Sequence, residues 1–144
     1  MLRSLSFVAL AVAAVAGIGY ADQPTSAKVA IPVTATAANS GKQMFENYCA
    51  PCHGMDAKGQ GPMAAALKKQ PADLTLLSKK NGGKFPSSHI RSVLEFGTAN
   101  PAHGTAAMPI WGPLLGKLDS TADPHVTALR IDNLSRYLET LQAK

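Results

Sequence analysis

Several patterns that mark common protein classes are missing from these 144 residues. No stretch alternates apolar and polar side chains in the manner of a half-buried strand, and no segment recurs at a fixed period. Aromatic and arginine residues do not interleave as they do on nucleic-acid-binding surfaces. These absences argue against a sheet, a repeat array and a nucleic-acid-binding module, and they favour one small domain of the all-α class.

Cysteine is scarce as well: the chain has two, and both lie in the run Cys49-Ala50-Pro51-Cys52-His53. The C-x-x-C-H spacing is typical of a covalent haem attachment site. On one helical turn the two thiols can each bond a vinyl group of the porphyrin, while the adjacent His53 lies beneath the iron and offers it a ring nitrogen. The motif occurs once, so we expect one haem c, attached through Cys49 and Cys52.

A C-x-x-C pair has two other common uses. A thioredoxin-like dithiol needs a βαβ pattern around it, which the flanking sequence does not show. A tetrahedral zinc site needs four ligands, so one of His89, His103 and His125 would have to join the motif, and their spacing is not that of a zinc finger. Both uses are disfavoured relative to haem attachment.

The first residues have the organisation of a secretory signal peptide. A short basic start at residues 1–3 precedes an apolar stretch from Leu5 to Ile18 and small residues near a cleavage point at residues 19–21. The stretch is shorter than the roughly 20 residues that span a bilayer, which disfavours the alternative of an uncleaved anchor. We therefore expect residues 1–21 to be a cleaved signal, the protein to be periplasmic, and no stable membrane insertion to remain.

The rest of the chain divides into a leader and one domain. Residues 22–39 are rich in Ala, Thr, Pro and Val without periodicity, and are expected to form a flexible leader outside the core. Residues 40–144 have the size of a single domain. Without the signal peptide, thirteen basic and nine acidic residues give a net charge of about +4.

Helix signals bracket this domain at both ends. Ser40 can cap a first helix, with Gln43 reaching back in a capping box, and that helix leads into the motif. Asp123 and Pro124 begin a last, amphipathic helix, in which apolar residues recur at three- to five-residue intervals. Between them three short helices are expected, at residues 62–69, 74–80 and 87–96.

Together these features resemble the class I cytochrome c family, and the resemblance covers residues 41–142. It implies a small all-α fold in which the N- and C-terminal helices cross, with short helices and loops wrapped around one covalent haem. In the family a small residue and an aromatic on the first helix meet an aromatic on the last. Gly41, Phe45 and Tyr137 stand at fitting positions here.

The iron needs a sixth ligand, and methionines are the first candidates. The other methionines lie in the signal peptide or too close to the motif, so Met63 and Met108 remain. Residues 108–112, Met-Pro-Ile-Trp-Gly, resemble the family's distal Met-Pro, and this resemblance assigns the metal ligand role to Met108 beside His53. His103 is the alternative, and it would give bis-histidine ligation.

The resemblance places two further residues at the cofactor. In the family a proline carbonyl just after a glycine accepts a hydrogen bond from the free ring nitrogen of the ligand histidine, and Pro62 fits that role, with an ordinary turn as the alternative. Trp111 resembles a tryptophan that lies near the haem propionates in several bacterial subfamilies, with an ordinary core residue as the alternative. His89 and His125 are expected at the surface.

This ligand set implies a periplasmic carrier of one electron that is not itself an enzyme. It would serve a dehydrogenase, a terminal oxidase or another cytochrome, either free or as a subunit of an oxidoreductase complex. The alternative is a haem enzyme or gas-sensing domain, which needs a displaceable sixth ligand. Five lysines predict docking to an acidic redox partner, with a merely solvated face as the alternative: Lys68, Lys69, Lys79, Lys80 and Lys84.

Overall fold

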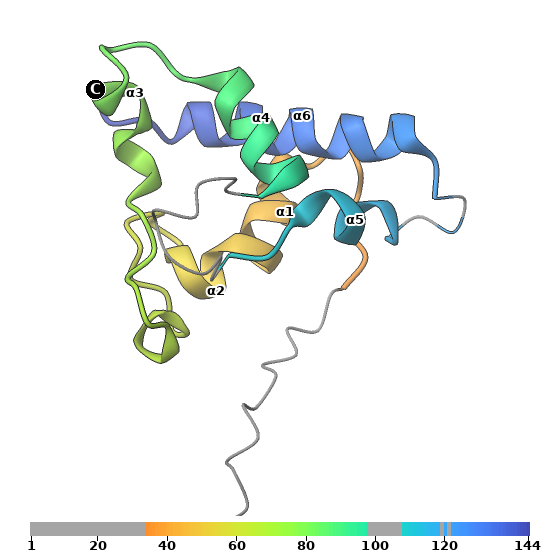
Figure 1. Ribbon diagram of the computed structural model, residues 1–144, viewed down its shortest axis with the longest axis horizontal. Helices are drawn as coiled ribbons and strands as arrows, with labels where there is room; N and C mark the ends of the chain where they lie inside the picture. Colours follow the sequence, from red (N-terminus) through yellow and green to blue (C-terminus); the bar gives the residue numbers. More distant parts are fainter. Residues whose placement is uncertain (1–33, 98–107, 119, 121) are drawn as a thin grey trace, which may run out of the picture. The chain divides into compact units, whose positions relative to one another are not determined.

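The computed structural model describes residues 34–97, 108–118, 120 and 122–144. These ranges contain helices and loops and no strand, which confirms the all-α class. Figure 1 shows the long α6 (Pro124–Thr140) lying against α4 (Ser87–Phe96), while α5 (Trp111–Gly116) packs against both of them. Within the same ranges, no helix is long and apolar enough to cross a membrane.

One helical run carries the C-x-x-C-H motif. Ser40 caps its first turn, as predicted, because its Oγ accepts a hydrogen bond from the backbone N–H of Gln43 at 3.3 Å. The Gln43 side chain does not complete a capping box; its Oε1 accepts instead from the backbone N–H of Ala37 at 3.5 Å. The run has a π-helical turn, a feature common at functional sites, between two α-helical pieces. Its parts are α1 (Gly41–Met44), η1 (Phe45–Cys49) and α2 (Ala50–His53).

The first and last helices cross at the residues that the family pattern selects. A Cβ atom at Gly41 would lie 2.1 Å from the carbonyl oxygen of Asn133 and 2.8 Å from Cβ of Tyr137, so only glycine fits this close approach of α1 to α6. The rings of Phe45 and Tyr137 meet with centroids 5.5 Å apart in a tilted arrangement. The predicted crossing is therefore present.

The last helix begins where its sequence signals place it. Oδ1 of Asp123 accepts from the backbone N–H of His125 at 2.8 Å, and Pro124 occupies the first helical position. The apolar face of α6 lies in a core shared with α1, α4 and α5. The core residues with the largest fully buried side chains are Tyr48, Phe45, Met44, Leu115 and Leu134.

The middle of the domain follows the expectations less closely. The helix expected at residues 62–69 is a single 3₁₀ turn, η2 (Ala64–Ala66), after which Leu67 is extended. Residues 74–80 are helical as two joined pieces, η3 (Leu74–Leu76) and α3 (Leu77–Lys80). The α5 helix was not expected, since its six residues include two glycines and a proline. Burial of Trp111 and Leu115 stabilises it.

Residues 34–39, expected as the end of a flexible leader, pack on the domain instead. Thr36 is buried, and its carbonyl accepts a hydrogen bond from Nη1 of buried Arg130 at 2.7 Å. The Tyr48 hydroxyl donates to the carbonyl of Thr34 and lies 3.0 Å from Oγ1 of Thr36. The prediction failed here because these contacts use backbone carbonyls and hydroxyls, which leave no hydrophobic periodicity. The folded domain thus begins several residues before the predicted boundary.

Candidate functional site

Both motif cysteines are free thiols. Cys49 is buried at the end of η1, and this burial, with a smaller contribution from nearby Cys52, raises the pKa of the Cys49 thiol to about 12. Burial also raises the pKa of Cys52, which is only partly covered. Because both pKa values are raised, each thiol stays protonated at neutral pH. The two sulfurs are not joined in a disulfide. Both are available for covalent attachment of a cofactor.

His53 is held in one orientation by a backbone carbonyl. Its Nδ1 lies 2.9 Å from the carbonyl oxygen of Ala72, so this nitrogen carries the ring proton and donates it. The other nitrogen, Nε2, then has a free lone pair. Burial lowers the pKa of His53, which favours the neutral ring. A neutral imidazole with one nitrogen fixed by a carbonyl is the form that proteins present to metal ions.

The carbonyl that accepts the hydrogen bond from His53 is not the predicted one. The resemblance gave the carbonyl of Pro62 this hydrogen bond, whereas the structure gives it to Ala72, 19 residues beyond the histidine. Pro62 is exposed at the turn before η2, so its contact with the cofactor stays a prediction. Ala72 could not be found from its side chain, because the backbone supplies the contact. The only sequence signal nearby is Pro71, which marks a bend in the chain.

The loop after the motif closes back onto it through its backbone. Three successive motif carbonyls, those of Pro51, Cys52 and His53, would otherwise lack partners at the end of α2. Each accepts a hydrogen bond from a loop N–H, and the donors are Met63 at 2.9 Å, Gly61 at 3.0 Å and Gly59 at 2.7 Å respectively. The two thiols and the imidazole therefore project from a helix end whose last carbonyls all have hydrogen-bond partners.

Gly59 also joins this loop to the segment that bears Ala72. Its φ is +83°, in the left-handed region that favours glycine. A Cβ atom there would lie 2.2 Å from the carbonyl oxygen of Pro71. A larger residue would push the Pro71–Ala72 segment away from His53. The glycine-rich loop thus sets the acceptor position on the proximal side.

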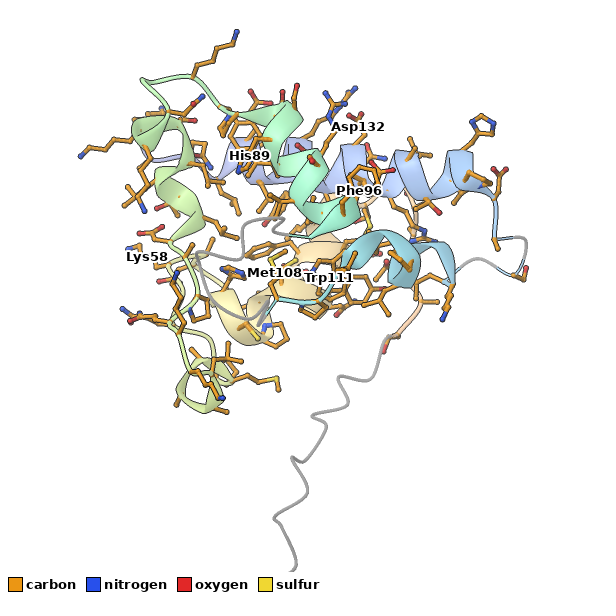
Figure 2. All side chains as sticks on the ribbon, in the orientation of Figure 1. Lys58, His89, Phe96, Met108, Trp111 and Asp132 are labelled. Atoms are coloured by element: carbon orange, nitrogen blue, oxygen red, sulfur yellow. The ribbon has the colours of Figure 1, made fainter. Side chains whose placement is uncertain are left out.

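The residues assigned to the distal side lie on the segment that leads into α5. Met108 is partly buried and packs against the core. Trp111 is buried and stacks on Tyr48, with ring centroids 5.7 Å apart and planes at 25°. Figure 2 shows Met108 and Trp111 on this segment. Tyr48 directly precedes Cys49, so the stacked pair joins the distal segment to the motif helix.

The other candidate ligands are placed as follows. His103 lies outside the described residues, and Met63 is half-buried just before η2. His89 and His125 are exposed on α4 and α6, as expected. In the described part of the chain, no three His, Cys, Asp or Glu side chains gather into a group that could hold a metal ion.

The residues that can hold a haem lie on two separate segments of the chain. Cys49 and Cys52 offer free sulfurs on one turn, and His53 offers a neutral, oriented nitrogen beside them. Met108 offers a polarisable thioether from a separate segment. A small all-α domain with this motif at the end of its first helical run is a haem c-binding domain.

Comparisons with known proteins agree with that class. Residues 38–142 match the family model described as cytochrome c. The chain is 31% identical over 110 residues to cytochrome c-554(547) of Halothiobacillus neapolitanus, covering 73% of this chain and 97% of that protein. The chain therefore belongs to the cytochrome c family, whose covalent haem supports electron transfer.

A second relative is a longer protein. The chain is 39% identical over 79 residues to the Cbb3-type cytochrome c oxidase subunit FixP of Rhizobium etli. The match covers 55% of this chain and spans 23% of the FixP length. No solved structure matches the chain.

Proposed function

We propose that the protein carries one electron at a time on a single haem, bonded to Cys49 and Cys52 and ligated by His53 and Met108. The observation that carries this proposal is the 2.9 Å contact of His53 Nδ1 with the Ala72 carbonyl, because it leaves Nε2 free beside two free thiols. Bound haem supplies an iron that alternates between the ferric and ferrous states. Family membership supports electron transfer as its use.

The distal assignment rests on where Met108 lies. It packs against the core immediately before α5, whose first residue, Trp111, stacks on the motif helix through Tyr48. The segment is thereby tied to the same helix that presents His53. Histidine–methionine ligation of haem raises the reduction potential relative to bis-histidine ligation, which suits a carrier near the oxidising end of a respiratory chain.

We further propose a periplasmic location and a protein redox partner. The signal-like pattern of residues 1–21 supports export, and unpaired cysteines in an oxidising compartment need a use such as haem attachment. The similarity to an oxidase subunit and to a cytochrome that the match covers almost completely supports electron exchange with another redox protein.

The test is spectroscopic and uses the exported holoprotein. Haem that stays with the protein through acid–acetone extraction, and is lost or weakly held in Cys52→Ala, supports covalent attachment. A weak far-red thioether-to-iron band in the oxidised protein supports methionine ligation. Met108→Ala should abolish that band, lower the potential and let carbon monoxide bind the reduced iron.

The matched variants are Met63→Ala and His103→Ala, which should keep the band. Loss of the band in Met63→Ala would move the ligand to that residue. An unaltered Met108→Ala spectrum together with a changed His103→Ala spectrum would establish bis-histidine ligation instead. Complete extraction of haem from the wild type would refute the proposal as a whole.

A further inference from the structure

The side chain of Gln142 clamps the C-terminal residues onto the middle of the domain. Its Nε2 donates to the carbonyls of Leu74 and Leu138, each at 2.8 Å, and its Oε1 accepts from the N–H of Ser78, also at 2.8 Å. The next N–H, that of Ala143, donates to the carbonyl of Thr75 at 2.9 Å. The amide nitrogen thus has two acceptors and the amide oxygen has one donor. An amide with its nitrogen and oxygen exchanged would lose all three hydrogen bonds.

The clamped segment is continuous with the carbonyl that orients His53. Ala72 is followed at once by Asp73, the N-cap of η3, and by Leu74, whose carbonyl Gln142 binds. The N–H of Leu74 donates to the carbonyl of Ala57 at 2.8 Å, which ties the same residue to the loop after the motif. Leu74 is thus held on both sides, two residues from the acceptor carbonyl.

The clamp is also fixed at its own end. Leu138, which accepts the second Nε2 bond, is a buried core residue of α6. Gln142 therefore transmits the position of α6 to η3 by direct hydrogen bonds. The other support of the Ala72 carbonyl, the glycine loop, is local to the motif. Gln142 is a support from the opposite end of the chain.

We infer that Gln142 is a positioning residue for the axial histidine: it holds the η3 segment so that the Ala72 carbonyl stays bonded to His53 Nδ1. This inference rests on the proposed function, in which His53 binds the iron. A hydrogen bond from the free ring nitrogen makes a ligating imidazole a stronger donor. A stronger donor stabilises the ferric state, so release of the clamp raises the reduction potential.

The test compares Gln142→Ala and Gln142→Glu with the wild-type holoprotein. Glutamate keeps an oxygen that can accept from Ser78, but it cannot donate to the two carbonyls. This variant tests the clamp even where the alanine variant fails to fold. Both should show a raised midpoint potential and faster solvent exchange of the His53 Nδ1 proton by NMR.

Two controls separate positioning from general destabilisation. Gln43→Ala removes an exposed glutamine of α1 whose only side-chain hydrogen bond among the described residues is the 3.5 Å bond from the backbone N–H of Ala37. Ile90→Val lowers stability from the core of α4 without touching the clamp. Neither should change the potential or the exchange of the His53 proton.

The outcomes are distinct. Potentials and exchange rates in both Gln142 variants that equal those of the controls would overturn the inference while leaving haem ligation by His53 intact. Absence of covalent haem in the wild type would instead remove the proposed function itself.

Discussion

Asp73 directly follows Ala72, whose carbonyl bonds to His53, and it caps η3. Its carboxylate accepts from the hydroxyl of Thr75 at 2.6 Å and from the Thr75 N–H at 2.8 Å. These bonds, the hydroxyl first, lower the pKa of Asp73, and the positive charges of Lys80 and Lys58 act in the same direction. The ionised carboxylate is therefore the form that the fold favours.

A pH dependence of stability follows from this pKa. A folded pKa below the unfolded value means that the stabilisation is complete above the unfolded pKa of about 3.9 and is lost as the pH falls through the folded value. Asp73→Asn should therefore lower the urea midpoint at pH 7 and have little effect near pH 2.

Urea unfolding of the two proteins from pH 2 to pH 7 measures the difference. Thr75→Val is the matched variant, since it keeps the carboxylate but removes the hydroxyl donor, and it should shrink the same pH-dependent difference. Parallel curves for wild type and Asp73→Asn at all pH values would contradict this account.

The crossing of α1 and α6 is the element-scale contact that depends most on a single residue. A methyl group at Gly41 meets backbone of Asn133 at 2.1 Å, and backbone cannot swing aside as a flexible side chain can. Gly41→Ala should therefore separate the helices and reduce the free energy of unfolding by about 1–3 kcal/mol, despite the better helix propensity of alanine.

Chemical denaturation measures this loss, with Gly116→Ala in α5 as the control. A Cβ atom at Gly116 meets only Oγ1 of Thr127 at 3.1 Å, and that hydroxyl can move. The control should keep or gain stability. A Gly41→Ala protein as stable as the wild type would show that the crossing tolerates a wider spacing.

The elements that the sequence predicted well are those with local signals. The α4 helix lies between a proline and a glycine, and α6 has an Asp-Pro start, so their bounds follow from the chain itself. The α5 helix and the Thr36–Arg130 contact have no such signal, because tertiary packing and backbone acceptors form them. The same limit applies at the site: the motif predicted Cys49, Cys52 and His53 as a group, but not the backbone carbonyl of Ala72.

At the scale of the whole molecule, the distribution of charge bears on partner choice. Lys68, Lys69, Lys79, Lys80 and Lys84 are all exposed, and Lys79 and Lys80 form the last turn of α3. Exposed charges steer an approaching anion, and salt screens them beyond a Debye length of about 10 Å at 0.1 M. Reduced protein should thus react with ferricyanide more slowly as salt is raised.

Reversal of the charges at Lys79 and Lys80 to Glu should slow this second-order reaction about tenfold at low salt, with little change of potential. Stopped-flow absorbance measures the rate. Reversal of Lys42 and Lys117, exposed lysines on other elements, is the control and should have a smaller effect. A second-order rate that changes neither with salt nor with charge reversal would favour an apolar docking surface.

The bond between Arg130 and Thr36 has a consequence for how the chain reaches its native state. It joins residues 94 positions apart, and closing a loop of that length costs about 4 kcal/mol of entropy. Gly41 likewise finds its partner only in the last helix. The helical run that carries the motif therefore gains its contacts with α6 only when nearly the entire domain is present. A chain that ended before α6 would lack these contacts, and its motif-bearing helical run would be exposed to proteolysis.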